Sequence, residues 1–143
     1  MALTELKLRI ADWKKDREKL SAIRSQVFIK EQNVPEEMEW DEYDESAVHF
    51  LVFDKENVIA SARLKSDGQI GRMAVLAEYR NRGIGTMLLL FILNTARDFE
   101  YKEVYLHAQV TAINFYQKQG FRCNTEIFYE ANIPHRGMLL KIC

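Results

Sequence analysis

The stretch from Ile70 to Gly85 constrains the fold more than any other part of the chain, because it reads as a strand, a tight basic loop and the start of a helix. Residues 70–76 are rich in apolar, strand-compatible side chains, whereas residues 86–99 carry apolar side chains at the spacing of one helix face. The loop between them therefore delivers backbone N–H groups to a helix N-terminus. Those groups have no partner within the helix and favour an anion such as phosphate.

The composition of this loop supports a phosphate ligand but excludes two common phosphate motifs. Arg80 and Arg82 add charged donors, and Gly83 and Gly85 let the backbone approach an anion closely. A Walker A loop needs a lysine directly after its second glycine, and a Rossmann fingerprint needs a third glycine where Leu88 stands. The residues expected to surround the phosphates are Arg80, Asn81, Arg82, Gly83, Ile84, Gly85 and Thr86.

The pattern Arg80-x-x-Gly83-x-Gly85 resembles the pyrophosphate loop of the GCN5-related N-acetyltransferase (GNAT) family, which cradles the diphosphate of coenzyme A. About thirty residues later, Phe115–Phe121 is similar to the second signature of that family, Phe/Leu-Tyr-x-Lys-x-Gly-Phe. The run Val27–Pro35 and the Ile-Pro-His stretch ending at His135 further resemble small GNAT proteins of the ElaA and YjcF type. Two motifs in register are far more specific than either alone.

The resemblance implies an α/β (α+β) GNAT fold, in which a mixed, largely antiparallel, splayed sheet of about seven strands is flanked by about four helices. We expect a single N-acetyltransferase domain over residues 1–143. The residue pattern places strands at 6–11, 47–54, 58–64, 69–76, 103–108, 123–129 and 137–142, with a linker at 130–136. It places helices from Leu20 to about Gln32, at 86–99 and at 111–119, and a polar turn and helix entry at 12–19.

Composition bounds the function further. With 20 basic and 21 acidic side chains the net charge is −1, so the chain has no global field of the kind that nucleic-acid binding needs. Two cysteines make a disulfide framework unexpected and fit a reducing compartment. No signal peptide is recognisable, and no apolar run approaches the roughly 18 residues of a membrane span. We therefore expect a cytoplasmic protein without a membrane or nucleic-acid partner. The sequence leaves open whether the protein forms a homodimer.

The GNAT resemblance implies acetyl transfer from acetyl-CoA, without a metal, to the primary or secondary amine of a small molecule. It assigns Tyr116 as the general acid beside the thioester sulfur and His135, whose imidazole titrates near neutrality, as the general base. The family also bulges the strand before the loop. Main-chain groups of Met73 and Val75 are therefore expected to contact the pantetheine arm.

Substrate residues are suggested by similarity to glyphosate N-acetyltransferase, in which positions matching Arg24, Arg72 and His135 serve the acceptor. Taken alone, Arg24 reads better as a snorkelling surface charge, whereas Arg72 in an apolar strand needs a partner or a cavity. Gln109 replaces a third arginine of that enzyme, which favours a less anionic, amino-acid-like acceptor. Seven carboxylates in residues 36–45 allow either a solvated loop or an acidic rim that attracts a polyamine or a lysine side chain.

The sequence also allows a function of a different class, and it contains another histidine, His49, whose role needs an interpretation. The chain could be a non-catalytic acetyl-CoA-binding or interaction module, although it retains both Tyr116 and His135. His49 lies among apolar residues, where a histidine is more often a hydrogen-bonded core residue than a catalyst, so we interpret it as structural.

Overall fold

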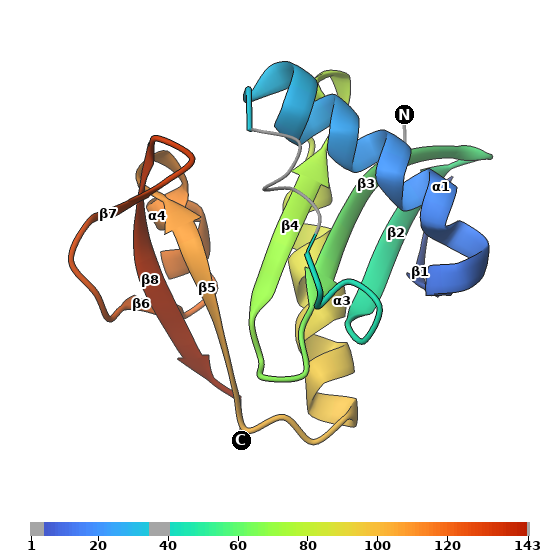
Figure 1. Cartoon of the computed structure of the whole chain (residues 1–143). Coiled ribbons are helices and arrows are strands. Elements are labelled where there is room, and N and C mark those ends of the chain that lie inside the picture. Colours follow the sequence, from blue (N-terminus) through green and yellow to red (C-terminus); the bar gives the residue numbers. More distant parts are fainter. Residues whose placement is uncertain (1–4, 35–40, 143) are drawn as a thin grey trace.

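The computed structural model describes residues 5–34 and 41–142, and within them the strands form two sheets that stand side by side (Figure 1). The first sheet has the order β1-β2-β3-β4, and its strands are Leu6–Ala11, Val48–Asp54, Asn57–Leu64 and Ile70–Val75. The second has the order β5-β8-β6 with β7 also paired to β8, and its strands β5 to β8 are Glu103–Gln109, Arg122–Cys123, Phe128–Glu130 and Ile133–Lys141. Every named strand pair is antiparallel.

The two sheets meet at one end only of β4 and β5. Gln69 forms a parallel bridge with Tyr105, whose backbone N–H donates to the carbonyl of Gly68 at 3.0 Å. Beyond this bridge the strands diverge, as Figure 1 shows for the green β4 and the orange β5. The edge of β4 is thereby exposed to a space between the sheets.

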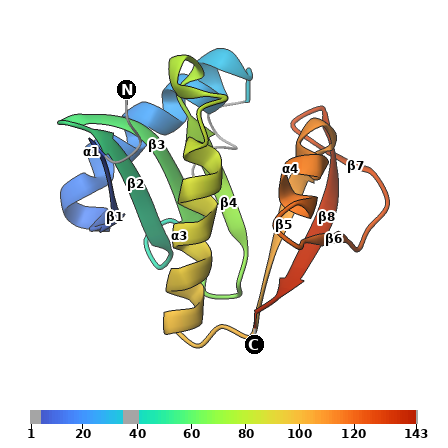
Figure 2. The same cartoon turned by 180° about the vertical axis from the view of Figure 1, so that it is seen from behind.

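Helices cover both faces of the first sheet. Helix α1, Trp13–Arg24, and the π-helical turn Ser25–Glu31 lie in front of this sheet in Figure 1, whereas α3, Ile84–Asp98, lies in front in the reverse view of Figure 2. The apolar face of α3 packs against β2 and β3 to form the main core, through residues that include Leu88, Ile92, Phe50 and Ile59. The short α4, Ile113–Gln117, packs beside the second sheet. No helix in the described ranges is long and apolar enough to cross a membrane.

The first helix begins seven residues earlier than its apolar periodicity predicts. Asp12 caps α1 by accepting hydrogen bonds from the backbone N–H groups of Lys14 and Lys15 at 2.9 and 3.1 Å. The following turn buries Asp16, which binds Arg9 of β1 through both carboxylate oxygens at 2.7 and 2.9 Å. Capping and ion pairing therefore stabilise as helix a polar segment that the sequence analysis interpreted as a turn and helix entry.

The strands at the C-terminal end differ from the sequence prediction in two ways. Residues 123–129 are not one strand but two short ones, β6 and β7. Strand β8 begins at Ile133 rather than Gly137 and pairs with β5 as far as His135 opposite Gln109. Gly137 explains the interruption, because its N–H donates to the Thr125 hydroxyl at 2.7 Å and a Cβ at position 137 would lie 2.7 Å from the Thr125 methyl group. The chain can cross β8 this closely only at a glycine.

Strand β4 carries the bulge that the sequence predicted. Its register on β3 pairs Arg63 with Gly71 and Ser61 with Ala74, so two residues of β4 oppose one of β3. Arg72 lies within the bulge with a φ of 50°, in the left-handed region. The bulge turns its side chain and that of Met73 toward the space between the sheets.

Candidate active site

A cleft of about 760 Å³ lies where β4 and β5 diverge, and we call it the central cleft. One wall comes from the first sheet and the segment before it, and the other from β5, β7, β8 and the start of α4. The residues of both walls that carry polar or reactive groups include Asp41, Arg63, Lys65, Arg72, Met73, His107, Gln109, Tyr116, Glu130 and His135. The structure thus gathers five predicted site residues: Arg72, Met73, Gln109, Tyr116 and His135.

Tyr116 reaches across the cleft from α4 to the bulge. Its hydroxyl donates to the Met73 sulfur at 3.9 Å, and its ring packs edge-on against Phe115 and Phe121. Burial raises the pKa of Tyr116 to about 12, so the phenol is protonated throughout the neutral range. This hydroxyl lies beside the bulged residues that the sequence assigned to cofactor contact.

His135 faces the cleft from β8, with a side chain fixed in one tautomer. Its Nδ1–H donates to the carbonyl of Ile133 at 2.7 Å, which leaves the lone pair on Nε2 when the ring is neutral. The imidazole is largely buried, at 8% exposure, and stacks on Phe128. The sequence placed His135 in a linker, but the structure holds it rigidly in a strand opposite Gln109.

A second imidazole lies on the same wall. His107 Nδ1–H donates to Glu130 Oε1 at 2.7 Å, and its ring meets the face of Phe128 edge-on. This hydrogen bond lowers the pKa of Glu130 below its usual value, and the charge of Arg72 acts in the same direction. The sequence predicts neither His107 nor Glu130 as a site residue, because only the pairing of β7 with β8 and of β8 with β5 brings them together.

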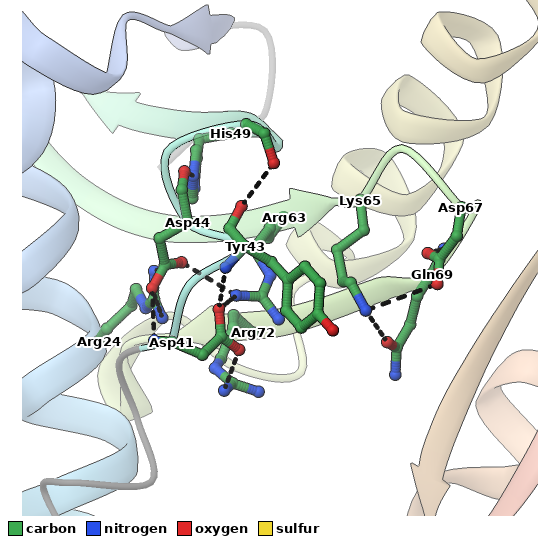
Figure 3. Close-up of polar contacts among 11 residues, drawn as sticks. Arg24, Asp41, Tyr43, Asp44, His49, Arg63, Lys65, Asp67, Gln69 and Arg72 are labelled. Atoms are coloured by element: carbon green, nitrogen blue, oxygen red, sulfur yellow. Dashed lines mark hydrogen bonds and ion pairs between the residues drawn. The ribbon is translucent and has the colours of Figure 1, made fainter.

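The opposite wall carries a ladder of alternating charges, shown in Figure 3. Asp44 accepts hydrogen bonds from Arg24 at 2.8 Å and from Arg63 at 3.0 Å, and Asp41 accepts from Arg63 at 2.7 Å and from Arg72 at 3.2 Å. Arg24, Arg63 and Asp44 are almost completely buried, and the end of the ladder formed by Arg63, Asp41 and Arg72 borders the cleft. The ladder therefore connects the interior beneath α1 to the cleft surface.

This ladder changes the interpretation of two sequence features. Arg24 is only 1% exposed and does not line the central cleft, so it is neither a snorkelling surface charge nor in contact with the cleft. Two carboxylates at the described end of the acidic segment differ from a fully solvated loop, since Asp44 is 3% exposed and Asp41 is bonded to two arginines. Glu42 and Glu45 are exposed, as the solvated-loop interpretation expects. The rest of that segment, including Trp40, lies outside the described residues. His49 is structural, as expected: its Nε2–H donates to the Asp44 carbonyl at 2.6 Å.

Gln109 links the two walls rather than standing open to a ligand. Its side-chain amide donates to the side-chain oxygen of Gln32 at 3.2 Å, and Gln32 follows the π-helical turn of the first half of the chain. Both glutamines line the cleft. A ligand that reaches Gln109 must therefore share or exchange this hydrogen bond.

The segment that the sequence predicts to bind phosphate, residues 80–86, which we call the phosphate loop, enters α3 after Gly83, whose φ is 80°. Asn81, Arg82 and Gly83 are exposed, and α3 begins at Ile84, two residues before the predicted start. Arg80 points back rather than outward: its Nε donates to the Val75 carbonyl at 2.9 Å and its two terminal nitrogens bind the Glu31 carboxylate. The turn that precedes α3 is thus exposed to solvent, and Arg80 anchors the loop to β4 and the π-helical turn.

Two sheets that diverge beside a bulged strand, with an exposed glycine-containing turn leading into α3, form the arrangement expected of an acyl-CoA-dependent N-acyltransferase. The family model described as "Acetyltransferase (GNAT) domain" matches residues 12–142, and the chain therefore belongs to the GNAT family.

Individual relatives agree with this assignment. YjcF of Bacillus subtilis (strain 168), described as an uncharacterized N-acetyltransferase, is 36% identical over 121 residues, which cover 82% of this chain and 86% of YjcF. The crystal structure of Escherichia coli ElaA matches with a TM-score of 0.83 and 33% identity, and covers 93% of this chain and 98% of ElaA. A GNAT acetyltransferase from Elizabethkingia anophelis with acetyl-CoA bound shares the fold, with a TM-score of 0.73 and 20% identity over 96% of this chain and 99% of that one.

The sequence prediction of a GNAT protein of the ElaA and YjcF type is therefore confirmed, and so is its mixed α/β fold class. The strand count differs slightly, since the described residues form eight strands rather than about seven. The chain is an acyl-CoA-dependent N-acetyltransferase of a family that uses acetyl-CoA.

Proposed function

We propose that the protein transfers the acetyl group of acetyl-CoA directly to the primary or secondary amine of a small, amino-acid-like molecule, with Tyr116 as general acid and His135 as general base. One observation carries this proposal. The Tyr116 hydroxyl and the His135 ring border the same cleft, whose other wall is the bulge at Arg72 and Met73. An acid and a base thus face a site that an activated thioester can enter along β4.

The phosphate loop supplies the donors for acetyl-CoA. The backbone N–H groups of residues 84–86 begin α3 and precede its first intrahelical bond, from Met87 N–H to the Gly83 carbonyl at 3.0 Å. Gly83 places them at an exposed turn, and Asn81 and Arg82 border it. In this proposal Arg80 acts by bracing the loop, while main-chain groups of Met73 and Val75 contact the pantetheine arm.

The reaction moves three protons. The acceptor arrives as an ammonium ion, and His135 Nε2 takes one proton to give a neutral amine and passes that proton to solvent. The amine nitrogen then attacks the thioester carbonyl and a C–N bond forms. As the C–S bond breaks, the nitrogen gives a second proton to His135, which leaves a neutral amide. The departing sulfur takes the proton of the Tyr116 hydroxyl, and Tyr116 recovers one from solvent. The raised pKa of Tyr116 keeps this proton in place until negative charge develops on sulfur.

The acceptor is favoured to carry a carboxylate, because Arg63, Lys65 and Arg72 all border one wall. Arg72 and Gln109 are the residues assigned to contact it. Arg24 contributes through Asp44, which it positions, rather than by touching the acceptor. A polyamine or a protein lysine remains the alternative acceptor that the acidic segment suggested, and a non-catalytic acetyl-CoA-binding module remains the alternative to an enzyme.

Thiol release tests the proposal. Purified protein is incubated with acetyl-CoA and each member of a panel of amino acids, polyamines and lysine peptides, and free CoA is measured by its reaction with a thiol reagent. Acetyl-CoA binding is measured separately by calorimetry. Turnover of amino acids is expected, whereas tight acetyl-CoA binding without turnover of any amine favours the non-catalytic module.

A further inference from the structure

We propose that Glu130 recognises the ammonium group of the acceptor, with His107 as the positioning residue that holds its carboxylate, so that the acceptor is a zwitterionic amino acid bound in one orientation. This inference rests on the proposed acetyl transfer and names the substrate class and the residue that selects it.

The sheet register puts Glu130 on the reactive face of the second sheet. Phe128 pairs with His135 and Glu130 pairs with Ile133, and His135 in turn pairs with Gln109. Because alternate residues of a strand point to the same face, one face carries the side chains of Phe128, Glu130 and His135 together with those of His107 and Gln109. The proposed base and Glu130 therefore flank a single aromatic ring, which stacks on His135 and meets His107 edge-on.

The carboxylate of Glu130 is held in place but retains an oxygen for a ligand. Its Oε1 accepts the hydrogen bond from His107, while its Oε2 has no hydrogen-bond partner among the described residues. The side chain is 46% exposed and borders the central cleft. The lowered pKa of Glu130 keeps it ionised in the neutral range. An ionised carboxylate with one free oxygen is the group that an ammonium ion needs.

The opposite wall decides the orientation and the class of substrate. Arg63, Lys65 and Arg72 border the cleft there, and their described carboxylate partners are Asp41, which also borders the cleft, and Asp44 and Asp67, which do not line it. A ligand in the cleft therefore meets cationic donors on this wall and a carboxylate at Glu130, an arrangement that directs its carboxylate to the wall and its ammonium group to Glu130. A polyamine would place a second cation against the arginines, so the charge pattern selects a molecule with opposite charges at its two ends. Its amine then lies next to His135, where it loses its proton.

Binding of three matched probes tests this assignment without requiring turnover. The full chain is saturated with CoA, and dissociation constants are measured for L-leucine, for 3-methylbutylamine, which lacks the carboxylate, and for 4-methylpentanoate, which lacks the ammonium group. L-phenylalanine, phenethylamine and 3-phenylpropionate form a second set. In each set the wild type is expected to bind the zwitterion more tightly than either of the other probes.

Variants of Glu130 supply the decisive comparison. Glu130→Gln is expected to weaken amino-acid binding about 10-fold, the scale of one hydrogen bond to a charged group, and to leave binding of the des-amino acid unchanged. Glu130→Asp keeps the charge and should retain most of the affinity. Glu126→Gln, an exposed carboxylate of the preceding loop that does not line the cleft, is the matched control. For His107, the alanine variant should lose affinity, and His107→Asn, which can still donate from the position of Nδ1, should restore part of it.

Two results would overturn the inference: equal loss for the zwitterion and the des-amino acid in Glu130→Gln, or wild-type protein that binds no ammonium probe more tightly than its des-amino counterpart. Failure of the proposed function looks different. If binding depends on Glu130 but no amine releases CoA from acetyl-CoA, the ammonium site stands and the catalytic proposal falls.

Discussion

Asp44 provides the sharpest test of how the charge ladder stabilises the fold. Its carboxylate binds Arg24 and Arg63, which are 1% and 4% exposed, so Asp44→Ala removes a buried counter-charge from both guanidinium groups. Breaking one partner out of a buried ion pair typically costs about 3–5 kcal/mol. Arg63 keeps Asp41 at 2.7 Å, so we expect the lower end of this range, about 3 kcal/mol.

The expected change in melting temperature follows from chain length. Unfolding entropies of about 2.1 cal/mol/K per residue give about 0.3 kcal/mol/K for 143 residues. A loss of about 3 kcal/mol therefore lowers the Tm by about 10 °C. Thermal unfolding followed by circular dichroism, with urea titrations at 25 °C, measures both quantities at pH 7.5. Asp98→Ala, at an exposed aspartate at the end of α3, is the control and should shift the Tm by less than 3 °C.

The pH dependence of the same variant gives an independent check. Burial alone would raise the pKa of Asp44, but the hydrogen bond and charge of Arg24, the backbone N–H of Asp41 and the charge of Arg63 together outweigh burial, so the pKa lies below its ordinary value. The stabilisation is therefore present above the ordinary pKa and disappears as the pH falls through the lowered one. The stability difference between wild type and variant should narrow in acid. A Tm shift no larger than that of the control, or a difference that does not change with pH, would refute the ladder as a source of stability.

Four further predictions concern the loop, the acid, the base and acid stability. Gly83→Val strains a residue whose φ is 80°, so the KM for acetyl-CoA should rise at least 10-fold; an unchanged KM would remove the loop assignment. Tyr116→Phe should lower kcat about 100-fold, and wild-type turnover would reduce Tyr116 to a packing residue. His135→Ala should abolish the acidic limb of the pH–rate profile, and its survival would place the base elsewhere. Asp16, whose pKa Arg9 lowers from 3.8 to about 2, stabilises the neutral fold by about 2 kcal/mol, so Asp16→Asn should unfold more easily at pH 7 but match wild type near pH 2.

The elements that the sequence predicted well are those whose side chains follow one period. The strands at 6–11, 47–54, 58–64 and 103–108 lie within one residue of their predicted bounds, because apolar or alternating residues fill a sheet covered by helices. Hydrophobic periodicity did not predict the first turns of α1 as helix. Their stability comes from polar contacts, the Asp12 cap and the ion pair of Asp16 with Arg9, which leave no apolar pattern in the sequence. The sequence predicted one strand instead of β6 and β7, because the interruption between them depends on contact with Gly137, which is distant in sequence.

The residues of the candidate site also fall into those that the sequence predicted and those that it did not. Tyr116, His135 and the bulge at Met73 were predicted because they fall on family motifs or beside them, and the structure brings them to one cleft. Arg63 could also have been predicted from the sequence. Like Arg72, it is a charged residue within an otherwise apolar strand, where a buried charge needs a partner. Glu130 carried no such signal, because its place beside the base exists only through the pairing of β7 with β8.

Because β4 and β5 diverge, separate walls of the cleft can bind the two ends of an acceptor independently. One wall belongs to the first sheet, where Arg63 and Arg72 are held by the aspartates of the preceding segment, and the other belongs to β7 and β8, where Glu130 is held by His107. The links between the walls at Gln69 with Tyr105, Gln109 with Gln32 and Tyr116 with Met73 include none of these charged side chains. A substitution of one charged side chain therefore leaves these links in place. The phosphate loop is braced separately, through Arg80 and Glu31. Substitutions on the two walls should therefore combine additively in acceptor binding, while acetyl-CoA affinity stays constant.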